Sequence, residues 1–297
     1  MKFAYFAGCA ARDSCQELDE ATREVAKDLK IQLVGMDGVA CCGAGNLQQT
    51  DPERALAVNA RTLAMAQAKG LDILTVCGAC QLYLSEAAQA LEDPETRERI
   101  NRGLGRTGST PYLGGVRVKH LLQVLLQDVG ERRLAAHVRR PLGDVAVGAF
   151  YGCRLLRAPG AEAFDTPSDP RSIERLVEIL GGNPLRYDGR SGCCGFDAPQ
   201  ATKDLTARLS ATALIKAKGA GATMVATPCP LCHLVLDAHQ KEAGKAAGTR
   251  IDMPVLHLSQ LVGLAFGIDP ERLGVRRHAV SVTPVIGRLE DGEVVKA

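Results

Sequence analysis

The sequence predicts an α/β protein made of two duplicated, Rossmann-like parallel-sheet domains related by pseudo-twofold symmetry. Three observations support this prediction. Four cysteines of the first half recur 152 residues later without slippage, the motif FAGC of the first half returns as FYGC, and apolar runs alternate with helical patterns in both halves. A spacing kept over so many positions indicates an internal duplication, and alternating strands and helices are typical of a doubly wound parallel sheet.

In the first half, short apolar runs predict strands and a period near 3.6 residues predicts helices. The expected strands are KFAYFA (2–7), IQLVGM (31–36) and LDILTV (71–76), and the expected helices cover 14–30, 51–69 and the segment opened by the CxxC motif at 77–80. The stretch VKHLLQVLLQDV (118–129) has an apolar stripe at helical spacing, and we expect it to pack on the first domain or on a partner.

The second half repeats this order. The expected strands are DVAVGAFY (144–151), PLRYD (184–188) and ATMVAT (222–227), and the expected helices cover 168–182, 200–219 and the segment opened by the CxxC motif at 229–232. Ser168 or Asp169 is the expected N-cap of the first of these helices, because Pro170 follows in its first turn and glycines end it.

The repeat also defines the predicted domains. The first covers 1–130 and the second covers 144–275, and a chain of 297 residues is long enough for each to bury its own core. Residues 131–143 form a predicted basic linker, which we expect to be a solvated face. The alternating pattern of the tail, 276–297, predicts a small hairpin.

Composition excludes several classes of function. Hydrophobic residues make up 46% of the chain and charged residues 24%, as in a soluble globular protein, and the formal net charge is +2. No basic run suggests a nucleic-acid surface, and no apolar run approaches the length that a membrane span requires. The start, MKFAYFAGCA, has too short an apolar stretch for a signal peptide, so we interpret it as the first strand of a cytoplasmic protein.

Eleven cysteines are the most informative residues of the chain. In a reducing compartment, cysteines at this density are more often metal ligands or redox groups than disulfides. Ten of them follow predicted strands and should gather at the carboxyl edges of the sheets, where such folds bind ligands. These ten are Cys9, Cys41, Cys42, Cys77 and Cys80 in the first half, and Cys153, Cys193, Cys194, Cys229 and Cys232 in the second.

Each half therefore offers five thiols. A tetrahedral zinc ion or a cubane cluster needs only four protein ligands, which leaves one thiol spare. Adjacent cysteines fit a single metal ion poorly, but they can hold neighbouring irons of an unusual cluster through a bridging thiolate. We therefore favour iron–sulfur clusters, with zinc or a strained vicinal disulfide as the alternatives.

The spacing C-x31-CC-x34-C-x2-C, repeated as C-x39-CC-x34-C-x2-C, resembles the cysteine-rich CCG domain. A tandem pair over nearly the whole chain resembles the B subunit of heterodisulfide reductases. This resemblance implies that the five cysteines of each half hold a non-cubane 4Fe–4S cluster. It also implies that a disulfide is cleaved or formed between the two clusters, with no side chain acting as a general acid. The sequence AARDSCQELDEAT after Cys9 is more similar to bacterial sulfur-oxidising relatives, which implies sulfur carried by a lipoate-binding protein.

The resemblance also implies partners. The chain has no ferredoxin-type cysteine run, no GxGxxG flavin fingerprint and no P-loop. A ferredoxin-like cluster subunit and a flavin subunit would then supply or collect electrons, and this chain would be the catalytic subunit of a disulfide oxidoreductase complex. One alternative is an electron-transfer iron–sulfur subunit of a hydroxyacid or succinate dehydrogenase. Another is a zinc-stabilised interaction module with zinc in one domain.

A few other residues suggest roles. Cys15 has no counterpart in the second half and is expected to be an ordinary buried thiol or a redox-active neighbour of the first site. His233, directly after the second CxxC motif, is expected to cap a helix or to support a ligand. Arg12 and Arg154 follow Cys9 and Cys153, and either could meet an anionic substrate group or simply be solvated. The histidines without ligand spacing are expected to be structural, namely His120, His137, His239, His257 and His278.

Overall fold

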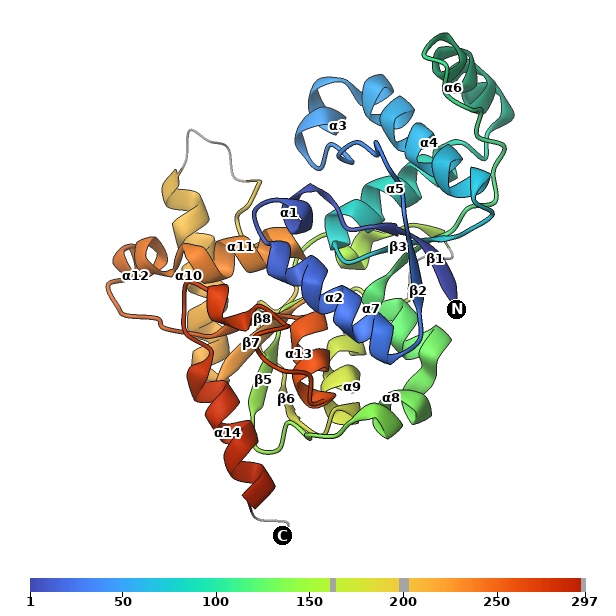
Figure 1. Cartoon of the computed structure of the whole chain (residues 1–297). Helices are drawn as coiled ribbons and strands as arrows, with labels where there is room; N and C mark the ends of the chain where they lie inside the picture. The colour runs from blue at the N-terminus through green and yellow to red at the C-terminus, as the bar shows by residue number, and fades with distance from the viewer. Residues whose placement is uncertain (161–163, 198–202, 295–297) are drawn as a thin grey trace.

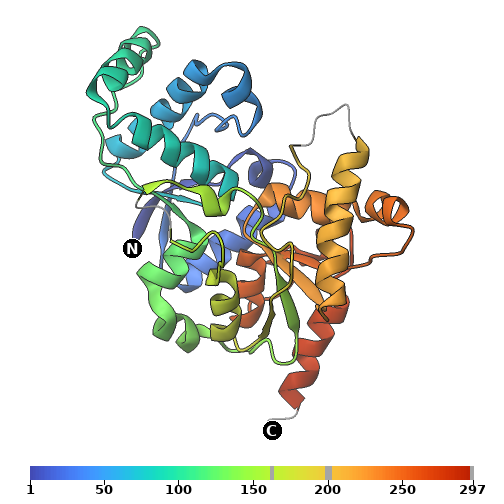
Figure 2. The same ribbon diagram turned by 180° about the vertical axis from the view of Figure 1, so that it is seen from behind.

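The computed structural model describes residues 1–160, 164–197 and 203–294, and it contains two α/β halves, each with one four-stranded sheet (Figure 1; Figure 2). All strands within each sheet are parallel. The first sheet has the order β2 (Gln32–Gly35), β1 (Lys2–Phe6), β3 (Ile73–Thr75), β4 (Val118–His120), and the second has the order β6 (Asn183–Leu185), β5 (Ala146–Ala149), β7 (Met224–Thr227), β8 (Val255–His257). The two orders correspond strand by strand, which confirms the predicted fold of duplicated parallel-sheet domains. The domain limits themselves stay a prediction.

The first half contains four strands joined mostly by helices. Its elements are β1 (Lys2–Phe6), α1 (Cys9–Arg12), α2 (Gln16–Asp28), β2 (Gln32–Gly35), α3 (Asn46–Thr50), α4 (Pro52–Ala68), β3 (Ile73–Thr75), α5 (Gly78–Ala90), α6 (Pro94–Arg106), β4 (Val118–His120), α7 (Leu121–Gln123), the π-helix η1 (Val124–Gly130) and α8 (Glu131–His137). Strand β1 is buried from Phe3 onward because a parallel strand is covered on both faces. Helix α4 begins where sequence rules place it, since Pro52 is its first residue and the Asp51 carboxylate accepts from the Arg54 N–H.

The second half repeats this arrangement, with a 3₁₀ turn where the first half has α1. Its elements are β5 (Ala146–Ala149), the 3₁₀ turn η2 (Leu155–Arg157), α9 (Ser172–Ile179), β6 (Asn183–Leu185), α10 (Lys203–Gly219), β7 (Met224–Thr227), α11 (Pro230–Ala238), α12 (Gln240–Ala247), β8 (Val255–His257), α13 (Leu258–Ala265), the 3₁₀ turn η4 (Val275–Arg277) and α14 (Thr283–Val294). Residues 200–202 of the predicted helix 200–219 lie outside the described residues.

The start of α9 corrects one prediction. The helix begins at Ser172, and the carboxylate of Asp165 accepts from the backbone N–H groups of Arg171 and Ser172. Asp165 therefore provides the capping hydrogen bonds that the sequence predicted for Ser168 or Asp169. Asp169 instead pairs with arginine side chains, so its carboxylate is not free to cap the helix.

The fourth strand of each sheet also departs from expectation. The sequence pattern predicts helix throughout 118–129, but Val118–His120 pair with β3 and helical structure begins only at Leu121. The apolar spacing of these three residues is helical, but their backbone hydrogen bonds with β3 hold them in a strand at the edge of the sheet. The equivalent strand β8, which pairs with β7, had no sequence prediction.

Two segments near domain ends form helices. The predicted hairpin in the tail is wrong: Thr283–Val294 form α14, which extends away from the body (Figure 1). Val285 and Leu289 are buried and four residues apart, a helical spacing that the apparent alternation concealed. The predicted linker, 131–143, contains α8, and Leu134 of this helix is fully buried rather than solvated.

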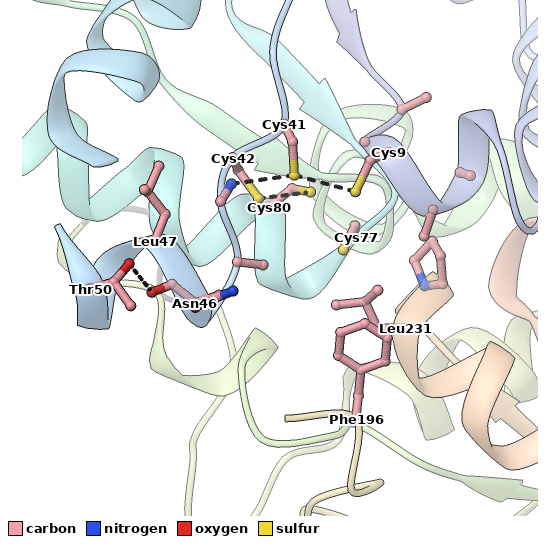
Figure 3. A pocket seen from close by; sticks show the side chains of 17 residues that line it. Cys9, Cys41, Cys42, Asn46, Leu47, Thr50, Cys77, Cys80, Phe196 and Leu231 are labelled. Carbon is pink, nitrogen blue, oxygen red and sulfur yellow. Dashed lines mark hydrogen bonds between the residues drawn. The ribbon is translucent and has the colours of Figure 1, made fainter. Parts of the chain in front are cut away.

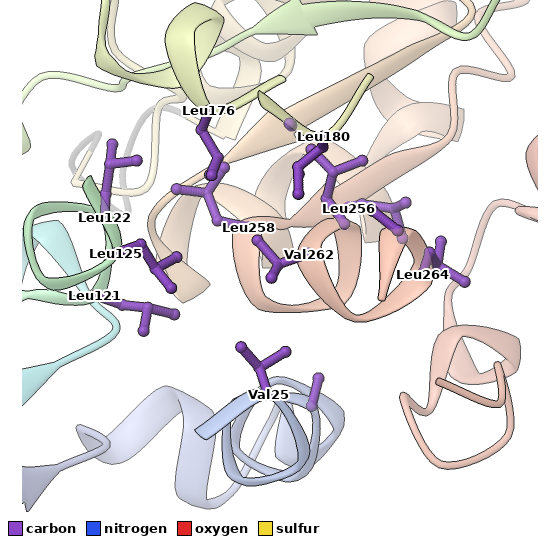
Figure 4. Close-up of a cluster of buried hydrophobic side chains, with 14 of the residues drawn as sticks. Val25, Leu121, Leu122, Leu125, Leu176, Leu180, Leu256, Leu258, Val262 and Leu264 are labelled. Atoms are coloured by element: carbon purple, nitrogen blue, oxygen red, sulfur yellow. The ribbon is translucent and has the colours of Figure 1, made fainter. Parts of the chain in front are cut away.

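Both halves contribute to the same hydrophobic clusters. A continuous cluster of buried side chains includes Val25 of α2, Leu125 of η1, Leu176 of α9 and Val262 of α13 (Figure 4). Helix α2 of the first half packs on α13 of the second. Because burial of this cluster fixes the two sheets against each other, it also fixes the relative position of their carboxyl edges.

A helix that crosses a bilayer needs about 20 predominantly apolar residues. Across residues 1–160, 164–197 and 203–294, no helix combines the length and the apolar character needed to cross a membrane.

Candidate metal centre

The five predicted thiols of the first half converge above the carboxyl edge of their sheet (Figure 3). Cys9 is the first residue of α1, directly after β1, and Cys77 caps α5 with Cys80 in its first turn. Cys41 and Cys42 lie in the loop between β2 and α3. The Sγ atom of Cys41 lies 3.4 Å from that of Cys9, and the Sγ atom of Cys42 lies 3.5 Å from that of Cys80.

The second half repeats this arrangement. Cys229 caps α11, with Cys232 in its first turn, and Cys193 and Cys194 lie in the loop after β6. In both halves three inner thiols are only 2–6% exposed, whereas the two outer thiols are more open. The inner thiols are Cys42, Cys77 and Cys80 in the first half and Cys194, Cys229 and Cys232 in the second.

A glycine before each leading cysteine makes this packing possible. A Cβ atom on Gly8 would lie 2.9 Å from the Sγ of Cys80, and one on Gly152 would lie 2.9 Å from the Sγ of Cys232. Both glycines have positive φ, +82° and +70°. The motif shared as FAGC and FYGC therefore has a physical reason, because any side chain at these positions would displace a buried thiol.

Each half stabilises the thiolate of its first paired cysteine, Cys41 or Cys193. Hydrogen bonds from Cys42 and Cys9 lower the pKa of Cys41, and hydrogen bonds from Cys153 and Cys194 lower that of Cys193. The backbone N–H groups two residues further on, at Gly43 and Gly195, lie 3.4 and 3.3 Å from these two sulfurs.

Five of the six inner thiols behave in the opposite way; the exception is Cys229, whose pKa is lowered by hydrogen bonds with Cys232 and Cys77. The hydrogen bond with Cys42 raises the pKa of Cys80, and the hydrogen bond with Cys194 raises that of Cys232. Several thiolates cannot share one buried pocket without a cation, since each disfavours ionisation of the next. The donor set therefore fits a positively charged, thiolate-binding metal group in each half.

The two thiol sets meet across the domain interface. The Sγ atoms of Cys77 and Cys229, which occupy the same position in the two halves, lie 3.7 Å apart. Phe196 and Leu231 of the second half line cavities over both sets, and Figure 3 shows them below the first-half thiols. The cavity over the first set has a volume of about 350 Å³, and the one over the second set about 20 Å³.

An ion pair fills the space around the second set. Arg154 pairs with Asp197, and its guanidinium carbon lies 5.3 Å from the centre of the Tyr83 ring. A Cβ on Gly45 of the first half would lie 2.8 Å from both members of this pair. Arg154 is thus already neutralised at the interface, which disfavours its predicted role toward an anionic substrate. Arg12, by contrast, lies on the surface.

Sequence reasoning missed Asp197 and Phe196, although a signal existed. At the offset of 152 residues that aligns the paired cysteines, Asp197 and Phe196 stand where the first half has Gly45 and Ala44. A comparison of the two halves position by position would therefore have marked them. Tyr83 belongs to the first half but contacts Arg154 of the second, and no local pattern predicts such a contact.

Cys15 and His233 are buried beside the second set. Burial raises the pKa of Cys15 to about 12, so this thiol is protonated, as expected of an ordinary buried cysteine. His233 lies one turn inside α11 and does not cap it, which corrects one of its two predicted roles. Its Nε2 atom lies 3.8 Å from Glu17, and one ligand atom from each of Glu17, His233 and His278 falls within 4.8 Å of the others.

A tandem α/β fold that brings two five-cysteine sets together at facing sheet edges defines a thiolate metal-binding protein of the cysteine-rich type. Comparison with known families agrees, since the cysteine-rich domain CCG matches residues 3–85 and again residues 147–237. The chain belongs to this family.

Full-length relatives are subunits of oxidoreductases. The chain is 37% identical over 282 residues to the 8-methylmenaquinol:fumarate reductase membrane anchor subunit of Wolinella succinogenes, covering 95% of this chain and 98% of the relative. It is 31% identical over 294 residues to the B subunit of the ferredoxin/F420H2-dependent CoB-CoM heterodisulfide reductase of Methanosarcina acetivorans, covering 97% of each. These likenesses, with the thiol sets, support an iron–sulfur redox subunit.

A solved structure shares the fold. A hypothetical protein from Helicobacter pylori superposes with a TM-score of 0.78 at 15% identity, over 95% of this chain. This chain spans about half of that protein, 52% of its length. The likeness supports the tandem fold.

Proposed function

We propose that the chain is the catalytic iron–sulfur subunit of a heterodisulfide reductase-like complex and holds two non-cubane 4Fe–4S clusters. The observation that carries this proposal is the contact between two complete five-thiol sets, with Cys77 Sγ 3.7 Å from Cys229 Sγ. Two redox groups so close together could act on the two sulfur atoms of one disulfide. In this proposal all ten repeated cysteines are ligands.

The number of thiols favours a multi-iron group over a single zinc ion in each half. A tetrahedral zinc ion takes four ligands, and Zn–S bonds of about 2.3 Å bring its sulfurs to roughly 3.8 Å from one another. The sulfur pairs at 3.4 and 3.5 Å fit two thiolates on one metal atom. Each half offers five free thiols, one more than a zinc ion binds, and a cluster of several irons has room for all five.

Different residues of this chain would hold the clusters and exclude water from the space between them. When bound, the clusters would supply one-electron chemistry for cleaving or forming an S–S bond. The outer thiols Cys9 and Cys41 face the open cavity, and apolar Phe196 and Leu231 exclude water between the two sets. Among the described residues that line the first-half cavity there is no carboxylate or histidine, so we assign no general acid.

The proposal includes partners and a compartment. The substrate is a disulfide or sulfur bound to a lipoate-binding protein, and electrons pass through a ferredoxin-like cluster subunit and a flavin subunit. The heterodisulfide reductase relatives, which are named as parts of larger enzymes, support an assembly of this kind. We propose a cytoplasmic site of action without nucleic-acid binding.

Metal content and electron paramagnetic resonance (EPR) test this function. Anaerobically purified protein should contain about eight irons and eight sulfides per chain, the number for two four-iron clusters. Oxidation with a disulfide substrate should produce a new EPR signal. About four irons with one zinc would leave one redox domain, and zinc alone after iron reconstitution would overturn the redox proposal.

A second function has support from one relative. Similarity to the fumarate reductase subunit of Wolinella succinogenes favours an electron-transfer iron–sulfur subunit that serves a flavoprotein acting on succinate, fumarate or a hydroxyacid. Both functions require clusters, so metal content does not separate them. Turnover separates them: the first predicts reduction of a disulfide by the loaded complex, and the second predicts oxidation or reduction of an organic acid without disulfide turnover.

A further inference from the structure

Two histidines outside the thiol sets occupy the same position in the two halves. His120 ends β4 and His257 ends β8, and both side chains are fully buried. The Nδ1 atom of His120 accepts from the N–H of Leu122 at 3.0 Å, and that of His257 accepts from the N–H of Ser259 at 3.3 Å. A backbone N–H can only donate, so the proton of each neutral ring must lie on Nε2.

These Nε2 protons point into the opposite half. His120 Nε2 donates to the carbonyl of Pro228 at 2.8 Å, and His257 Nε2 donates to the carbonyl of Val76 at 2.9 Å. Pro228 directly precedes Cys229, and Val76 directly precedes Cys77. Each half therefore supplies a hydrogen bond to the peptide group that leads into the CxxC motif of the other half.

Burial makes these two bonds costly to lose. A buried carbonyl without a donor loses its hydrogen bond and gains no water in exchange. Burial also lowers the pKa of His120 to about 4 and lowers that of His257, so both rings are neutral near pH 7 and donate from the same atom. The anchored peptides sit where Cys77 and Cys229 approach each other, so a small rotation of either one would move a buried sulfur.

We propose that His120 and His257 are crossed positioning residues: His257 orients the first-half motif at Cys77 and His120 orients the second-half motif at Cys229. The inference rests on the proposed function only in that these cysteines carry clusters. It predicts that removing either histidine disturbs the thiols of the other half more than those of its own. A residue that merely stabilises its own domain would do the reverse, since each ring also caps a helix of its own half.

Redox spectroscopy on variants that keep only one complete set of five cysteines tests whether each histidine acts on the opposite half. Cys193→Ser/Cys194→Ser leaves the first-half set, and Cys41→Ser/Cys42→Ser leaves the second. In the first background His257→Leu should shift the midpoint potential and EPR line shape, whereas His120→Leu should leave both unchanged. In the second background the effects should exchange. The proposal would be overturned if each histidine changed the potential of the cluster in its own half, or if neither substitution changed the potential in either background.

Thiol labelling keeps the test valid if the cysteines hold no cluster. In metal-free, reduced, full-length protein, His257→Leu should speed alkylation of Cys77 about fivefold, the factor for about 1 kcal/mol of lost local stability, and leave Cys229 unchanged. His120→Leu should do the opposite. Equal acceleration at both cysteines would contradict the crossed arrangement even where the iron proposal had already failed.

Two control variants separate positioning from folding. His→Gln at either position keeps an N–H donor of similar reach and should restore most of the wild-type signal. His239→Leu removes an exposed histidine at the start of α12 and should change neither the potentials nor the labelling. If His→Gln behaves like His→Leu although the variant melts at the wild-type temperature, the Nε2 hydrogen bond is not what positions the motif.

Discussion

Substitution of Gly8 by alanine tests whether close packing at the FAGC motif builds the first thiol set. Gly8 has φ +82° and ψ 163°, a backbone region that is almost restricted to glycine. Placing alanine there costs about 1–3 kcal/mol of backbone strain. The new Cβ would also lie 2.9 Å from the Sγ of Cys80, which is buried and has little room to retreat.

Two consequences should follow for Gly8→Ala. Strain of about 2 kcal/mol should lower the melting temperature by about 4–8 °C. Displacement of the Cys80 sulfur should impair the first ligand set only, so iron after anaerobic reconstitution should fall to about half of the wild-type value. Gly152→Ala should do the same to the second set, because its Cβ would lie 2.9 Å from the Sγ of Cys232.

A matched glycine provides the control. Gly103 lies inside α6, and no described atom beyond its own helix lies within 4 Å of the place that a Cβ would take. Gly103→Ala should therefore stabilise the protein by about 0.5–1 kcal/mol and leave its iron unchanged. The assays are thermal melts of the reduced, metal-free protein and iron analysis after identical reconstitution. Full iron in Gly8→Ala, with a melting temperature within about 2 °C of wild type, would refute the argument from packing.

Three further predictions concern the surroundings of the thiol sets. Cys15→Ala should leave iron content unchanged whereas Cys80→Ala lowers it, because Cys15 is a buried, protonated thiol outside the sets; equal losses on metal analysis would contradict this. Burial lowers the pKa of His278 from 6.5 to about 4, so protonation of this ring is less favourable in the folded state than in the unfolded state. The stability that the neutral ring contributes is complete above pH 6.5 and is lost as the pH falls toward 4. At pH 5 the free energy of unfolding is smaller by roughly 2 kcal/mol on this account. Melts between pH 4 and 8 should show this slope, and His278→Gln should reduce it. Arg154→Gln should cost about 2 kcal/mol by leaving Asp197 partly buried and unpaired, and adding Asp197→Asn should recover about half of that loss; purely additive effects in the double-mutant cycle would rule out the pairing.

Local sequence patterns predicted most elements of this fold because their signals are strong. Helix α4 has Asp51 and Pro52 at its start, and β1, β3, β5 and β7 are apolar runs that lie inside the sheets. The failures share a cause. The residues of β4 belong to a stretch with helical spacing, and those of β8 belong to an apolar stretch without strand signals. Both are three-residue edge strands that form because a neighbouring strand pairs with them. Pairing between distant segments leaves no local trace.

The sequence identified the residues of the candidate site more completely than the elements of the fold around it. Repetition of the cysteines located both thiol sets, and the geometry brings the predicted sulfurs together in each half. What the repeat could not provide is the relation between the halves. The approach of Cys77 to Cys229, and the bonds from His120 and His257 to the opposite half, depend on how two domains dock. An internal repeat predicts two similar domains but not which of their faces meet.

Duplication has produced two similar thiol sets in unequal surroundings. The ten repeated cysteines and the glycines before Cys9 and Cys153 are the same in both halves, since each serves the geometry of the thiols. The differences lie among the residues that fill space beside them, where Ala10, Ala44 and Gly45 of the first half correspond to Arg154, Phe196 and Asp197 of the second. These larger second-half side chains line a cavity of about 20 Å³, whereas the cavity over the first set has about 350 Å³. Small residues beside Cys9 and Cys41 therefore leave the first set open to a ligand, while the second set is enclosed by its own domain and by Tyr83 of the first.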